Sequence, residues 1–242
     1  VVWLYVVLLV ILSLLFVLGY VSKGAESWFR LGGIAFQPSD LMKLGIIIVL
    51  AKYFSRRHIE IANIKHIIVS FVYMFIPFVL VVLQPDFGSA MVLFFIWFGL
   101  VFVSGISIKH LLAVFVIGGV TFLLAWNFAF KQYQKARIMN FINPLQGIRG
   151  TGYNAYQSTI AVGSGGMLGK GVGYGTQSRL NFLPEHKTDF IFAAYAEEWG
   201  FVGSILLLLF FGIIFFKLAQ YALVADSTFE ALFTYGVLIW II

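Results

Sequence analysis

The side chains best suited to chemistry gather at the end of one polar segment, where Asp189 and Phe190 meet an apolar run. Glu185, His186 and Lys187 precede Asp189, so acids and bases stand close together in the sequence. Such a cluster can hold a carboxylate as a general base. The structural alternative is that Asp189 begins a helix, whose dipole favours a carboxylate there by about 0.3–1 kcal/mol. From these residues alone, the structural alternative has the stronger support.

The same segment is rich in glycine, notably from Gly163 to Lys170. It departs from a phosphate-binding loop, because Gly171 follows Lys170 and Ser164 takes the place of the first glycine. We therefore expect no nucleotide site. Glycine permits either a flexible loop or a backbone that closely approaches a ligand. Hydrogen-bonding side chains in the segment favour the ligand: Tyr153, Asn154, Gln157, Ser158, Gln177 and Ser178.

Lys43 stands inside an apolar run that Pro38 opens, roughly 7–8 Å along the axis of a helix. A charge inside a membrane is costly and is usually paired or functional. Asp40, three residues earlier on the same helical face, is one candidate partner. The other is an acid from a different span at the same depth, and Asp189 is the right kind of residue.

Asp86 follows Gln84 and Pro85 between two apolar runs. Pro85 breaks the helix at this point and frees backbone groups. We expect Asp86 to cap the next helix through the amides of Gly88 and Ser89, rather than to act directly in catalysis.

The remaining charged candidates have structural or lipid-binding interpretations. Glu197 and Glu198 lie roughly 12 Å beyond Asp189 along a helix axis, and neighbouring positions point about 100° apart. At most one of the two can therefore share a helical face with Asp189. We expect these glutamates to have a structural role as partners in ion pairs or hydrogen bonds. Arg30 either binds an anionic lipid phosphate or pairs with Glu26.

Membrane helices must position these residues. The chain is 61% hydrophobic and 11% charged, which leaves too little polar surface for a water-soluble domain. It contains no cysteine, so disulfides and thiolate metal sites are excluded. A span needs about 20 mostly apolar residues. The sequence predicts about six full spans and a truncated one: 1–21, 34–54, 67–83, 89–105, 111–130, 190–216, and a last run from about 231.

Basic residues orient the spans, because short cytoplasmic loops carry an excess of Lys and Arg. The loop 55–65, Lys109 and Lys217 are therefore predicted on the cytoplasmic side. The polar candidates then share the outer side, in the loops 23–33 and 131–189 and in the turn 84–86.

A series of motifs covers most of the chain: Gly24-Ala25…Trp28…Leu31-Gly32…Gln37-Pro38-Ser39-Asp40…Lys43, Gln84-Pro85-Asp86-Phe87-Gly88-Ser89-Ala90, Gly152-Tyr153-Asn154…Gln157-Ser158…Gly163-Ser164-Gly165-Gly166…Gly169-Lys170-Gly171, Gly175-Thr176-Gln177-Ser178…Phe182-Leu183-Pro184-Glu185…Thr188-Asp189-Phe190-Ile191-Phe192-Ala193, and Glu197-Glu198. In this order the motifs resemble the SEDS family (shape, elongation, division and sporulation), the RodA and FtsW class of bacterial cell-wall polymerases. Residues 175–185 are more similar to RodA than to FtsW.

The resemblance has departures. The family usually has ten spans, and this chain matches the part from the third to the ninth. It also starts without Met and stops within an apolar run. We therefore expect a fragment of a ten-span protein, in which residues 1–242 form a single transmembrane domain that includes the loop 131–189. Lys187 stands where the family more often has His, and Asp40 where it more often has Glu.

The resemblance implies an all-α polytopic membrane protein, a SEDS-type helical bundle in the bacterial cytoplasmic membrane with its active site on the outer side. The implied activity is a peptidoglycan glycosyltransferase that polymerises lipid II into glycan strands during elongation and rod-shape maintenance. Its implied partners are lipid II, the growing lipid-linked strand, membrane lipids and a class B penicillin-binding protein, with no nucleic acid. By resemblance, Asp189 is the essential catalytic carboxylate and Lys43 its partner.

For this reaction we expect Asp189 to act as the general base on a GlcNAc 4-hydroxyl, which attacks the anomeric carbon of MurNAc with inversion. Undecaprenyl pyrophosphate leaves, and protein cations or a divalent cation (Mg or Mn) stabilise its charge. We assign no metal ligands and expect no organic cofactor. The structural polar candidates are Glu197 and Glu198. The substrate-binding candidates are Arg30, Gln37, Asp86, Asn154, Gln157, Ser158, Lys170, Gln177, Arg179, Glu185 and His186.

Two other classes stay open. Lipid flippases and other transporters also carry intramembrane charges and helix breaks, although no inverted repeat is visible in this chain. A scaffold that binds the penicillin-binding protein through apolar faces is the third alternative.

Overall fold

The computed structural model describes residues 1–18, 20–22, 25–31, 34–56, 64–105, 107–128, 130, 132–142, 152–180, 182–183 and 188–242. The chain divides into two units, Val1–Phe115 with Phe215–Ile242, and Val116–Ile214. The helices α5 (Ile108–Phe128) and α9 (Ile191–Val224) each run from one unit into the other.

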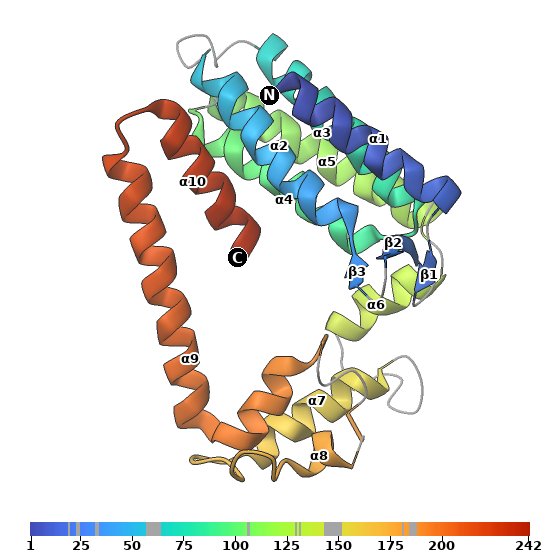
Figure 1. The fold of residues 1–242 in the computed structure, drawn as a ribbon, viewed down its shortest axis with the longest axis vertical. Coiled ribbons are helices and arrows are strands. Elements are labelled where there is room, and N and C mark those ends of the chain that lie inside the picture. The colour runs from blue at the N-terminus through green and yellow to red at the C-terminus, as the bar shows by residue number, and fades with distance from the viewer. Residues whose placement is uncertain are drawn as a thin grey trace. The chain divides into compact units, whose positions relative to one another are not determined.

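The first unit is a helical bundle built around α2 (Pro38–Ser55). This helix packs against α1 (Val2–Leu18), α3 (Ile64–Leu83), α4 (Phe87–Val103) and α10 (Thr228–Ile241) (Figure 1). Because these neighbours cover most of it, α2 buries most of its residues, including Met42, Ile46, Ile47 and Leu50. One stripe of the helix, through Leu41, Ile48 and Lys52, is less buried.

A small sheet lies in the chain between α1 and α2. Its strands β1 (Tyr20–Ser22), β2 (Ala25–Leu31) and β3 (Ile34–Phe36) are antiparallel in that order. The sequence predicted a loop and then a span from residue 34. Instead, 34–36 pair with β2, and the helix begins at Pro38, whose fixed φ and missing N–H suit the first helical turn.

The second unit holds the polar segment. After α5 come α6 (Gln132–Ile142), α7 (Tyr153–Ser164), the single turn α8 (Thr176–Arg179) and the first part of α9. The predicted outer loop 131–189 is therefore partly helical. The buried core of this unit consists of Ala161 from α7, Leu183 from the segment after α8, and Ala193 from α9. Phe190 packs against it.

The predicted helical membrane fold is confirmed, with a helix at each predicted span. By length and composition, three helices in the described part of the chain can cross a membrane: Ile64–Leu83, Lys109–Phe128 and Ile191–Val224. Three more apolar helices are shorter: Val2–Val17, Phe87–Val103 and Thr228–Ile241. α2 carries Asp40, Lys43 and Lys52, which lowers its apolar content below that of the others.

Candidate functional site

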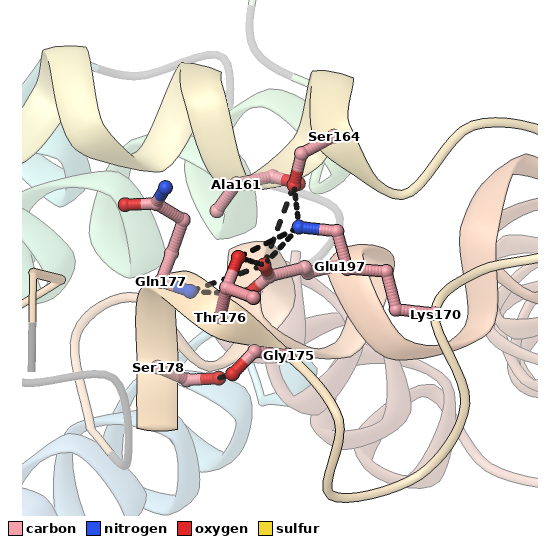
Figure 2. A network of polar contacts seen from close by, with 8 residues as sticks. All are labelled: Ala161, Ser164, Lys170, Gly175, Thr176, Gln177, Ser178 and Glu197. Carbon is pink, nitrogen blue, oxygen red and sulfur yellow. Dashed lines mark hydrogen bonds and ion pairs between the residues drawn. The ribbon is translucent and has the colours of Figure 1, made fainter. Parts of the chain in front are cut away.

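Glu197 is the centre of a polar network in the second unit (Figure 2). Its side chain is 0% exposed, although it stands on α9 among apolar residues. Oε1 accepts hydrogen bonds from Lys170 Nζ at 2.8 Å, Thr176 Oγ1 at 3.0 Å and the Gln177 backbone N–H at 3.1 Å. A buried carboxylate is costly unless it is paired and hydrogen-bonded, and these donors meet that requirement.

Lys170 supplies the opposite charge. Its Nζ also donates to Ser164 Oγ at 2.9 Å and to Thr176 Oγ1 at 2.8 Å, and its side chain is 28% exposed. Protein oxygens therefore occupy all three ammonium donors. The sequence proposed Lys170 as a substrate-binding residue; in this arrangement it joins the glycine-rich loop to α9.

The glycine-rich loop, residues 166–171, also supplies backbone hydrogen bonds where α9 is interrupted. Gly200 has φ +68° and ψ −166°, so the helical hydrogen bonds across it cannot form. In their place, the carbonyls of Glu197 and Glu198 accept from the N–H groups of Lys170 and Gly171, each at 3.0 Å. The Phe201 N–H donates to Gly166 O at 2.9 Å, and the Val202 N–H to Met167 O at 3.1 Å. Backbone groups freed by the kink are therefore satisfied by residues 166–171.

Glycine is required on both sides of this contact. A Cβ on Gly200 would lie 2.7 Å from Leu168 C and against the backbone nitrogen of Gly169. A Cβ on Gly169, which has φ +80°, would lie 2.5 Å from Glu198 C. The sequence suggested that these glycines let the backbone approach a ligand closely. In the structure, the backbone that Gly169 approaches is that of α9.

Asp189 lies in the turn just before α9 and is exposed. Its carboxylate forms no hydrogen bond or ion pair with any residue that the structure describes. The next residue, Phe190, accepts the first helical hydrogen bond, from the Ala194 N–H at 3.2 Å. Asp189 is therefore held next to a fixed helix start while its own oxygens face outward. Glu185 and His186, which the sequence grouped with it, lie outside the described residues.

Most polar candidates of α7 and α8 are partly buried. Gln157 Nε2 donates to Tyr153 OH at 3.1 Å, and Ser158 Oγ donates to Ala155 O at 2.8 Å. The side-chain oxygens of Gln157 and Gln177 are buried and have no hydrogen-bond partner among the described residues. Two further candidates complete this group: Asn154, half-buried on α7, and Arg179, exposed at the end of α8.

The first unit gathers a second set of candidates at the start of α2. Lys43 Nζ lies 2.7 Å from Asp40 Oδ1; Lys43 is 8% exposed overall, and the Asp40 side chain is 53% exposed. The Lys43–Asp189 pairing would join residues of separate units, so it stays a prediction. Arg30 belongs to β2, where its backbone pairs with that of Ala35.

Asp86 is the N-cap of α4, as the sequence predicted. Its Oδ1 accepts from the Ser89 N–H at 3.1 Å, and its Oδ2 accepts from Gln37 Nε2 at 2.8 Å. Gln37 precedes Pro38, so this contact ties the start of α2 to the start of α4.

The described residues contain no group of three or more His, Cys, Asp or Glu that could hold a metal ion. The carboxylates of Asp40 and Asp86 are engaged by Lys43 and by Gln37 with Ser89. Participation of a divalent cation therefore stays a prediction.

The sequence analysis did not identify Ser164 and Thr176 as partners of Glu197 and Lys170, nor Gly200 as the contact point between the loop and α9. The available signal was a glycine-rich loop and an acid within an apolar helix. Only the three-dimensional structure links them.

Comparisons with known proteins converge on one family. The sequence model of the FtsW/RodA/SpoVE family, described as cell cycle protein, matches residues 1–242. The peptidoglycan glycosyltransferase MrdB of Escherichia coli K12 is 36% identical over 237 residues, which are 98% of this chain and 64% of that protein. The probable peptidoglycan glycosyltransferase FtsW of Haemophilus influenzae is 34% identical, over 96% of this chain and 59% of that protein.

Two solved structures have the same fold. A chain from a peptidoglycan synthase complex, solved to show how polymerization and crosslinking are coordinated, has a TM-score of 0.79 and 30% identity over 98% of this chain and 65% of that chain. The rod shape determining protein RodA of Thermus thermophilus has a TM-score of 0.65 and 30% identity over 98% of this chain and 60% of that chain. The present chain thus spans less than two thirds of the length of these relatives.

Proposed function

Because the chain belongs to the FtsW/RodA/SpoVE family of cell cycle proteins, we propose that the protein is a peptidoglycan glycosyltransferase. It polymerises lipid II into glycan strands on the outer side of the bacterial cytoplasmic membrane. The family match over the whole chain and the similarity to MrdB support this activity. The similarity to MrdB and to RodA also supports a role in elongation and rod-shape maintenance.

One geometric observation carries the proposal. Asp189 is an exposed carboxylate at a fixed helix start, and no described residue neutralises it. The buried acid eight residues later, Glu197, is fully engaged by Lys170 and its neighbours. Of these two acids, only Asp189 can therefore reach an incoming hydroxyl group, and Glu197 serves to hold the loop.

The chemistry assigned to Asp189 is proton abstraction. A general base must lie within about 2.6–3.2 Å of the hydroxyl oxygen that it deprotonates. As Asp189 takes the proton from the GlcNAc 4-hydroxyl, that oxygen forms a glycosidic bond to the anomeric carbon of MurNAc. The bond from this carbon to undecaprenyl pyrophosphate breaks, and the leaving group carries away the electron pair. Attack opposite the leaving group inverts the anomeric centre.

The pyrophosphate develops negative charge, which a preorganised cation stabilises. Lys43, Arg30 and Arg179 are the protein candidates, whereas the ammonium donors of Lys170 are already occupied. Lys43 in particular is largely buried, and its Nζ lies 2.7 Å from the carboxylate of Asp40. We assign Lys43 the role of partner to the reacting groups.

The proposed protein partner is a class B penicillin-binding protein. The similarity to a chain of a peptidoglycan synthase complex, in which polymerization and crosslinking are coordinated, supports this assignment. A polymerase produces uncrosslinked glycan, so the transpeptidase that acts on its product is a partner of matching chemistry.

The test is polymerisation of purified lipid II by the full-length protein with its penicillin-binding protein. Asp189→Asn keeps the size of the side chain and removes the base, so glycan strands should not form. Asp226→Asn is the matched control, because Asp226 is exposed in the turn between α9 and α10. Strands formed by Asp189→Asn at the wild-type rate would overturn the assignment. Movement of lipid II across liposomes without polymerisation would support a transporter instead.

A further inference from the structure

A separate cavity lies in the first unit, at the end of α2 opposite to Lys43. Its volume is about 350 Å³, within the size range of small-ligand sites. α1, α2 and α3 all line it, and these helices pack on one another (Figure 1). The proposed glycosyltransferase reaction uses none of the lining residues.

Two cations stand at the rim of this cavity. Lys52 and Arg56 are four residues apart on the last turn and C-cap of α2, so both face the same side of the helix. Arg56 is exposed and Lys52 is half-buried, with its Nζ 5.4 Å from the centroid of the Phe229 ring. Neither forms an ion pair with a carboxylate in the described part of the chain.

Aromatic and apolar groups form the walls. The ring centroids of Tyr5 and Tyr73 lie 5.6 Å apart in an edge-to-face arrangement, and those of Tyr53 and Tyr73 lie 6.1 Å apart. The Tyr5 hydroxyl donates to Tyr73 O at 2.9 Å, and the Tyr53 hydroxyl lies 2.9 Å from His66 Nδ1. Because the protein itself uses these hydroxyls, the tyrosines serve as rigid walls, and the two cations are the groups left to bind a ligand.

A purely structural role of Lys52 and Arg56 explains their position but not the space beside them. Cations at the end of a helix interact with its dipole, and that effect needs no cavity. Here, however, residues of two other helices line a half-open space beside the cations. The basic sequence after Arg56 assigns this end of the bundle to the cytoplasmic face. The inner leaflet is rich in anionic lipids, and basic pockets between membrane helices bind their head groups.

We propose that this cavity binds the phosphate-bearing head group of an anionic phospholipid from the inner leaflet. Lys52 and Arg56 contact the phosphate, and the tyrosine rings with Val49 contact the glycerol and the first methylene groups. The ligand is then a lipid that holds α1, α2 and α3 together at the end of α2 opposite to Lys43. This site is independent of the glycosyltransferase proposal.

Lipid binding to the purified full-length protein tests the proposal, by native mass spectrometry and by the shift in melting temperature. Phosphatidylglycerol should bind and raise the melting temperature by several degrees, and phosphatidylcholine should not. Lys52→Gln/Arg56→Gln should weaken phosphatidylglycerol binding about 25-fold, because each basic residue near an anionic surface contributes roughly a factor of five.

The matched control removes two charges elsewhere on the same predicted side. Lys109 and Lys217 are exposed and do not line the cavity, so Lys109→Gln/Lys217→Gln should keep the wild-type affinity. Equal weakening by both double variants would overturn the site, since the effect would then be one of net charge. Stabilisation by inorganic phosphate alone to the same extent would also overturn the lipid assignment. Arg56→Gln by itself changes an exposed side chain, so it keeps the fold and should still weaken binding.

Discussion

Lys170 Nζ lies 2.8 Å from Oε1 of Glu197, and the Glu197 side chain is fully buried. The pair, drawn in Figure 2, joins the loop 164–176 to α9. Gly200 interrupts that helix shortly after Glu197. Four backbone hydrogen bonds around the kink connect the same two segments. A long glycine-rich segment is thereby held in one conformation beside the helix that Asp189 precedes.

The ion pair makes the two charges interdependent. Lys170→Met should cost about 2–4 kcal/mol in the free energy of unfolding, because it leaves a buried carboxylate without its cation. The double variant Lys170→Met/Glu197→Gln should recover part of this loss, since no unpaired charge remains. Denaturant unfolding of the four members of this cycle measures the coupling. Costs that simply add would show that the pair contributes nothing.

Lys109→Met serves as the control for loss of a lysine. Lys109 is exposed at the start of α5, so its replacement should change the free energy of unfolding by less than about 0.5 kcal/mol.

Gly200 should not tolerate a side chain. Gly200→Ala places a methyl group against the backbone of Leu168 and Gly169 and adds strain at φ +68°. The loop should then separate from α9, which limited proteolysis between residues 164 and 180 would detect as faster cleavage. Gly212→Ala is the matched control on the same helix, because a Cβ there meets no atom within 4 Å. Equal protease resistance of the two variants would contradict the proposed contact.

Asp86 allows a structural role to be separated from a chemical one. Asp86→Ala should destabilise the protein by about 1 kcal/mol through loss of the N-cap. Asp86→Asn retains the cap, since Asn and Asp are similar N-cap residues, and loses only the contact with Gln37. Lipid II polymerisation by Asp86→Asn should therefore stay close to wild type. A large loss of activity at an unchanged melting temperature would give the carboxylate a chemical role.

The sequence was a good guide to whatever depends on local composition. The apolar runs predicted the helices, and the Gln84-Pro85-Asp86 break predicted the N-cap of α4. Pro38 was predicted to open the run that contains Lys43, and α2 begins there, whereas the predicted bound of the span at Ile34 was wrong because residues 34–36 form β3. The strand pairing of residues 20–36 depends on contacts between strands, which periodicity over so short a segment does not reveal.

The site was less predictable because its contacts are distant in sequence. Lys170 and Glu197 are 27 residues apart, and a lone lysine in a glycine-rich loop suits a phosphate ligand as well as an ion pair. Gly200 looked like an ordinary residue of an apolar helix, and only its backbone angles identify the kink. The role of Asp189 came from the family resemblance, because an exposed acid before a helix is common in proteins that do no chemistry.

Lys43 is the candidate whose role is most sharply testable. It forms an ion pair with Asp40 at 2.7 Å, but the Asp40 side chain is 53% exposed, and a pair of this kind contributes about 0–1 kcal/mol. If Lys43 acts on the reacting groups, Lys43→Met should abolish most lipid II polymerisation, while Asp40→Asn should leave it largely intact. Both variants should be produced and should unfold like the wild type. Equal losses of activity would instead assign Lys43 to its pair with Asp40, because each variant breaks that contact and only one removes the cation.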